Sequence, residues 1–183
     1  MKDIAQFKAA NVSQMRTIVI YRDGFPQEHI SFPYIRESEW EEIADMSTPW
    51  ENSTLYRFLT NSRFLITVFR SEGHNRSEIS KDSDVLLGGF LWNMPAEDID
   101  KYVKPVWMAA RKLLQTENSI HYASNNQLPG ISYNHVFHIR PHARNRQDRI
   151  TLPNGETIVK QAFWLDKEYL GNIIRRHFTE DSL

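Results

Sequence analysis

A run of basic side chains follows a short alternating segment near residue 140. Apolar Phe137 and Ile139 alternate with the other side chains of residues 136–140, and this period of two predicts a strand. Pro141 has no N–H to donate, so we expect the strand to end before it. The loop beyond carries three arginines and one acid: Arg144, Arg146, Arg149 and Asp148.

Arginines that leave a rigid strand on a polar loop can present charge to an anionic ligand. The guanidinium is a planar donor whose geometry matches the oxygens of a phosphate and the edge of a base. The same pattern also fits a solvated loop that pairs with acids elsewhere in the protein. The residues of this segment alone leave both interpretations open.

The overall composition gives no further support for nucleic-acid binding. The 183 residues include 22 Lys and Arg against 23 Asp and Glu, a net charge of -1, so any such argument depends on local clustering. Hydrophobic residues make up 40% and aromatic residues 12%, which predicts a globular domain with a core. No cysteine is present, which excludes disulfides, thiolate zinc sites and cysteine nucleophiles and suits a reducing cytoplasm.

No apolar run reaches the roughly 18–20 residues that a membrane span needs. The first ten residues also lack the apolar region of a signal peptide. We therefore expect no membrane partner.

The elements that must position the basic loop are predicted from period and turn residues. We expect strands at 15–21, 28–32, 63–69, 85–92, 136–140 and 160–165, and helices at 39–46, 53–60, 95–114 and 167–178. The first two strands should form a hairpin about Asp23-Gly24, Ser38 and Asp166 should cap helices, and residues 71–84 should form a polar loop. The almost continuous apolar run at 63–69 predicts a central, buried strand. The predicted fold class is α/β, with a mixed central β-sheet flanked by helices.

The first strand has neutral or fixed-charge side chains where a metal-dependent nuclease needs ionisable ones. Gln14 and Arg16 share one face of it. Glutamine has no charge to hold a divalent ion, and arginine does not lose its proton and binds phosphate as a fork. His135 and His138 lack the spacing of a zinc site. We therefore predict no catalytic residue and no metal ligand in this chain.

Three segments carry a family resemblance. Residues 139–145, Ile-Arg-Pro-His-Ala-Arg-Asn, resemble the I-R-P-K-x-x-N segment of the MutH-like mismatch-repair endonucleases, and residues 163–167 with 174–178 resemble the family's F-Y-L-K-K segment and closing helix. The chain more closely resembles the C-terminal half of the two-domain GATC-cutting type II restriction endonucleases of the Sau group. In that group a similar R-P-H loop leads to a K-Q-x-F-W segment, here Lys160–Trp164.

The resemblance implies a MutH-like restriction-endonuclease fold that holds duplex DNA in a cleft. It implies that Arg140 and Pro141 read bases in the major groove, that Trp164 lies near an adenine, and that Glu28 contacts a base. It also implies DNA contacts from the rest of the basic loop and of the K-Q-x-F-W segment, namely His142, Arg144, Asn145, Arg146, Arg149, Lys160 and Gln161.

The family's catalytic set is changed throughout. Its Glu-x-Lys becomes Gln14 and Arg16, the region of its aspartate holds Phe7, and its further lysine falls near Thr60. The C-terminal half of the Sau-group enzymes likewise lacks the catalytic set and binds a second GATC copy as an allosteric effector.

The prediction is therefore a single MutH-like DNA-binding domain over residues 1–183, from the C-terminal part of a longer bacterial, cytoplasmic enzyme of a restriction-modification system. Its partners would be double-stranded DNA and an active nuclease domain in the same longer chain. The domain itself would need no cofactor, and Mg²⁺ would serve the parent nuclease. Two alternatives stay open: an active Mg²⁺-dependent endonuclease that recruits Asp3, Asp23 or Glu28, and a protein-interaction or dimerisation module.

Overall fold

The computed structural model describes residues 11–71, 84–116 and 127–178. The chain divides into two compact units. The first consists of Met1–Ile30, Thr60–Met94 and Lys167–Leu183, and the second of Ser31–Leu59 and Pro95–Asp166. The expectation of one domain over the whole chain stays a prediction. The expectations for Asp3, Phe7 and most of the loop 71–84 lie outside the described residues.

The first unit contains a mixed three-stranded sheet. It is formed by β1 (Gln14–Ile20), β3 (Phe64–Arg70) and β4 (Val85–Trp92) in the order β1-β3-β4. β1 runs parallel to β3, and β4 runs antiparallel to it. β3 is central and most of its side chains are buried, which confirms the position predicted from its apolar run.

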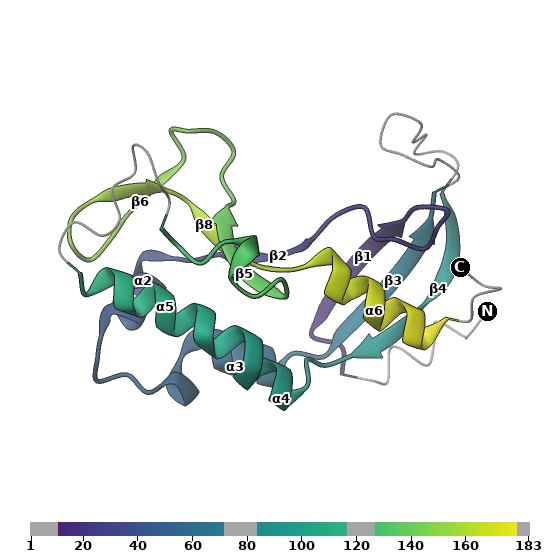
Figure 1. Cartoon of the computed structure of the whole chain (residues 1–183), viewed down its shortest axis with the longest axis horizontal. Coiled ribbons are helices and arrows are strands. Elements are labelled where there is room, and N and C mark those ends of the chain that lie inside the picture. Colours follow the sequence, from purple (N-terminus) through teal and green to yellow (C-terminus); the bar gives the residue numbers. More distant parts are fainter. Residues whose placement is uncertain (1–10, 72–83, 117–126, 179–183) are drawn as a thin grey trace. The chain divides into compact units, whose positions relative to one another are not determined.

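Helix α6 (Lys167–His177) also belongs to this first unit and begins directly after Asp166. Figure 1 shows α6, in yellow, beside the strands of this sheet. The ring of His177 stacks on Phe90 of β4 with 3.9 Å between centroids. A Cβ at Gly89 would lie 3.0 Å from the carbonyl oxygen of Ile66. Gly89 therefore marks a close backbone approach between β4 and β3.

The predicted hairpin between the first two strands is wrong. Its turn is present: Tyr21 N–H donates to the Phe25 carbonyl at 2.8 Å, and Gly24 adopts a φ of 81°. After one isolated bridge between Ile20 and Pro26, however, the chain leaves β1. β2 (Ile30–Tyr34) instead lies beside β8 in a different sheet. The turn residues fix the reversal locally, whereas burial of apolar side chains selects the partner of the strand.

The second unit contains the strand that carries the basic loop. Its three-stranded sheet has the order β2-β8-β5, with β5 (Phe137–Pro141) antiparallel to β8 (Gln161–Leu165). A separate hairpin follows the basic loop and pairs β6 (Arg149–Thr151) with β7 (Thr157–Val159). Gly155, with a φ of 84°, lies in its turn. The strands expected from the sequence did not include these two short ones.

Helices complete the second unit. They are α2 (Glu37–Ala44), η1 (Trp50–Asn52), α3 (Thr54–Asn61), α4 (Ala96–Asp98), the π-helical η3 (Ile99–Val103), α5 (Lys104–Leu114) and η4 (Ile131–Tyr133). The helical run predicted over 95–114 is confirmed. It tolerates Pro105 because this residue lies in the first turn of α5, after η3. The predicted cap Ser38 is wrong, because α2 begins after Arg36, whose N–H donates to the Glu39 carboxylate at 2.9 Å.

Arg111 joins two of these helices inside the second unit. Its side chain is only 7% exposed. From α5 it donates to the carbonyl oxygens of Ile43 and Thr48, each at 2.8 Å, and its guanidinium carbon lies 4.0 Å from the centre of a Trp107 ring. The charge is thus buried with carbonyl acceptors and an aromatic face around it. Among the described helices, none combines the length and the apolar character that a membrane crossing demands.

Candidate nucleic-acid interface

The end of β5 is more regular than its proline suggested. Pro141 pairs with Gln161 within the ladder, and the next residue, His142, donates its N–H to the Lys160 carbonyl at 2.8 Å. Ile139 sends its N–H away from β8, to the Pro129 carbonyl at 2.8 Å. Two residues later, the missing N–H of Pro141 faces that same outer side, so no β8 bond is lost. The prediction that the ladder ends before Pro141 is therefore wrong.

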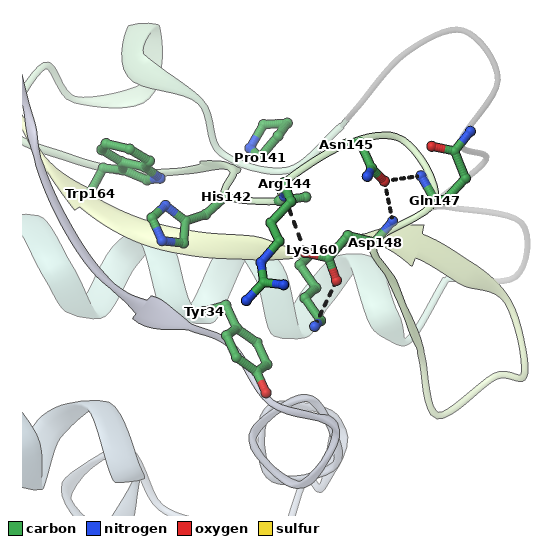
Figure 2. Close-up of a pocket in the computed structure, with 10 residues that line it drawn as sticks. Tyr34, Pro141, His142, Arg144, Asn145, Gln147, Asp148, Lys160 and Trp164 are labelled. Carbon is green, nitrogen blue, oxygen red and sulfur yellow. Dashed lines mark hydrogen bonds and ion pairs between the residues drawn. The ribbon is translucent and has the colours of Figure 1, made fainter.

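The basic loop after β5 is folded by its own polar groups. The Asn145 side-chain oxygen accepts the N–H groups of Gln147 at 2.9 Å and Asp148 at 3.1 Å. The Asp148 carboxylate accepts the N–H of Arg144 at 3.2 Å. Figure 2 shows these bonds as dashed lines across the loop. Asn145, predicted to contact DNA, thus has its oxygen engaged in shaping the loop.

Three residues predicted to contact DNA lie together at the start of the loop. The guanidinium carbon of Arg140 is 4.9 Å from the centre of the Trp164 ring, and the Trp164 Nε1–H donates to the Arg140 carbonyl at 3.3 Å. The His142 ring lies nearly edge-on to Trp164, with 5.4 Å between centroids. Trp164 therefore contacts both the side chain and the backbone of the strand end that presents Arg140.

An ion pair joins the loop to the residue before β8. Lys160 Nζ lies 2.7 Å from Asp148 Oδ1, and the two side chains are 26% and 23% exposed. The hydrogen bond from Lys160 lowers the pKa of Asp148, with the Arg144 N–H adding to the effect. The same bond raises the pKa of Lys160. Both groups are therefore charged at neutral pH.

These residues surround an open pocket of about 900 Å³. Its lining includes Tyr34, Pro141, His142, Arg144, Lys160 and Trp164. In Figure 2, the side chains of Arg144 and Lys160 point into the same space, toward Tyr34. Lys160 Nζ lies 4.6 Å from the centre of the Tyr34 ring.

Sequence reasoning missed Tyr34. The sequence offers one signal, an aromatic residue shortly after the predicted strand 28–32. In the structure this residue is 40% exposed. That signal does not reveal that β2 lies next to β8, so only the sheet order brings Tyr34 to the pocket.

Other residues predicted to contact DNA have different surroundings. Arg146 is exposed on the loop, whereas Arg149 donates to the side chain and carbonyl of Thr157 across the β6–β7 hairpin. Gln161 is 1% exposed and donates to the Val159 carbonyl at 2.8 Å. A contact between Gln161 and DNA stays a prediction.

The remaining predicted residues belong to the first unit. Glu28 is exposed, and Gln14 and Arg16 alternate along β1, both half-buried. Burial lowers the pKa of Arg16, but an arginine so shifted still carries its charge at neutral pH. Within residues 11–71, 84–116 and 127–178, no group of three or more His, Cys, Asp or Glu side chains could hold a metal ion.

Comparison with known proteins gives one informative similarity. No protein-family model matches the chain. The chain is 23% identical over 203 residues to the type II restriction enzyme Sau3AI of Staphylococcus aureus. The match covers 92% of this chain and 39% of that enzyme, so the chain spans well under half of its relative's length. This distant similarity supports a restriction-enzyme-related domain.

Proposed function

We propose that this chain is a sequence-specific double-stranded DNA-binding domain that recognises a GATC-type site. In this proposal it is a catalytically degenerate effector domain, with a MutH-like fold, of a type II restriction endonuclease. The observation that carries the proposal is the strand end that presents Arg140, beside a prefolded basic loop and an open pocket. The similarity to a type II restriction enzyme supports the choice of DNA as the ligand.

Arg140 is well placed to read a base. Guanine offers two acceptors, O6 and N7, in the major groove, and the arginine fork donates to both at once. The Arg140 backbone is held by β8, and its side chain packs against Trp164. A side chain and loop that are ordered before binding lose less conformational entropy when DNA arrives.

The chemistry of β1 supports a binding role. Gln14 and Arg16 stand where the resembling nucleases have a Glu and a Lys, and neither can supply the negative charge that holds Mg²⁺. The chain matches only 39% of its relative, which leaves room for a separate nuclease domain in a longer protein. Mg²⁺ would then serve that domain, and the effector would act on it by binding a further copy of the site.

The test compares two short duplexes, one with GATC and one scrambled, by fluorescence anisotropy at one fixed salt concentration. The titration is done in EDTA, and Mg²⁺ is then added and the DNA checked for cuts. Tighter binding to GATC with intact DNA is the expected result. Equal affinity for the two duplexes would refute sequence recognition, and cutting in Mg²⁺ would refute the non-catalytic role. The titration is then repeated at several salt concentrations, and binding that is insensitive to salt would refute a phosphate-binding interface.

A further inference from the structure

Asp148 is held by two donors that could also bind an anionic ligand. It is the single acid among residues 136–149. One of its oxygens lies 2.7 Å from Lys160 Nζ, and the other accepts the Arg144 N–H at 3.2 Å. An ammonium group and a backbone N–H are also what a protein uses to bind a phosphate oxygen.

The surroundings of this ion pair allow a ligand to reach it. Lys160 and Asp148 are each about one quarter exposed, at 26% and 23%. They line the open pocket of about 900 Å³, into which the Arg144 side chain also points (Figure 2). A partly exposed ion pair contributes little to stability, because water screens it. Exchanging its carboxylate for a phosphate therefore costs the fold little.

We propose that this pocket is a subsite for a single backbone phosphate of DNA, and that Asp148 competes with that phosphate for Lys160. The inference rests on the proposed DNA-binding function and deepens it. Tyr34 and Arg144 complete the subsite, the first from β2 and the second from the loop. A phosphate that enters must separate Lys160 from Asp148 and approach a negative charge.

This competition makes Asp148 a specificity-determining residue. A duplex seated by base contacts of Arg140 has binding energy to offset the loss of the ion pair and places its phosphate in one position. A duplex of other sequence is not held in that position, so its phosphate does not displace Asp148 and makes no contact with Lys160. Specificity arises when the wrong ligand meets a cost that the right ligand can overcome.

The test is Asp148→Asn, which keeps the side-chain shape and an oxygen that can accept the Arg144 N–H, but removes the charge. Asp100→Asn is the matched control, because Asp100 is an exposed acid in η3 of the same unit and does not line the pocket. Dissociation constants are measured for GATC and scrambled duplexes over a series of salt concentrations. Thermal melting of each variant shows that it is folded.

Asp148→Asn should tighten binding to the scrambled duplex by about fivefold and to the GATC duplex by less, so that the preference for GATC falls. The salt dependence on the scrambled duplex should steepen by about 0.9 in log–log slope, which corresponds to one further phosphate contact. Asp100→Asn should leave the GATC preference unchanged. Adding Lys160→Gln to Asp148→Asn should abolish the gain, because the phosphate then has no ammonium to bind.

Other results separate the inference from the proposed function. If the wild type prefers GATC but Asp148→Asn weakens binding to both duplexes, Asp148 only braces the loop and the subsite is refuted. If Asp148→Asn and Asp100→Asn have the same effect, the change is one of general charge and the subsite is again refuted. If the wild type does not prefer GATC, the proposed function fails and the inference fails with it.

Discussion

Replacing Arg140 by lysine keeps a positive charge at the end of β5 but removes the planar fork to which we assign the proposed guanine contact. Lysine still attracts phosphate as a point charge but cannot donate two parallel hydrogen bonds to O6 and N7. Arg140→Lys should therefore weaken binding to a GATC duplex and change binding to a scrambled duplex by less than about twofold. Arg140→Ala should weaken GATC binding further, because the charge is lost as well.

The size of the effect follows from the contacts that Arg140 makes. A bidentate contact to a base contributes about 1–3 kcal/mol of discrimination, which corresponds to about 5- to 150-fold in affinity. Arg140 is exposed, so its contact with the Trp164 ring at 4.9 Å adds only about 0.5–1 kcal/mol. Trp164→Leu should therefore reduce the GATC preference by about two- to fivefold, through Arg140, and should have little effect in an Arg140→Ala background.

Fluorescence anisotropy with three duplexes tests this reasoning. The first contains GATC, the second the same site with its first G·C base pair replaced by an A·T base pair, and the third a scrambled sequence. The wild type should prefer guanine at that position, and Arg140→Lys should lose most of the preference. An equal loss of affinity on all three duplexes would show that Arg140 contacts phosphate alone. An additive effect of Trp164→Leu and Arg140→Ala would show that Trp164 contacts DNA independently.

Three further predictions follow from other contacts. Asn145→Ala removes the acceptor of two loop N–H groups and should weaken binding to the GATC and the scrambled duplex alike, by about three- to tenfold. A changed preference for GATC would instead indicate that Asn145 contacts a base. Arg111→Met should lower the free energy of unfolding by about 3 kcal/mol in urea titrations, because buried carbonyls lose their donor; an unchanged midpoint would refute this. Hydrogen bonds from Thr48 and Ser47 lower the pKa of Asp45 to about 2. The wild type should therefore melt at a higher temperature than Asp45→Asn, with the full difference above about pH 4 and none toward pH 2, where Asp45 becomes protonated in the folded protein too. A difference that persists at pH 2 would contradict this prediction.

The sequence by itself determined most of the elements and the chemistry of the candidate site. Period and turn residues located β1, β3, β4 and β8 to within a residue or two, as well as α3, α6 and the long helical run that ends at Leu114. They also placed Arg140 at the end of a strand before a basic loop. The residue types of Gln14 and Arg16 predict, without any coordinates, that the nuclease pair of the resembling family is missing. These inferences depend on neighbours in the chain, which is why the sequence contains them.

Only the tertiary structure decided which segments meet. The turn after β1 predicted a hairpin, yet β2 lies beside β8, and this placement brings Tyr34 to the pocket. A proline in a strand shows that one N–H is missing but not which way it would point, so the continued ladder at Pro141 could not be foreseen. The partnership of Asp148 with Lys160 likewise depends on how the loop closes against β8. Strand pairing and loop closure are set by burial and hydrogen bonding between segments distant in the chain. A local sequence pattern therefore does not predict which segments will pair.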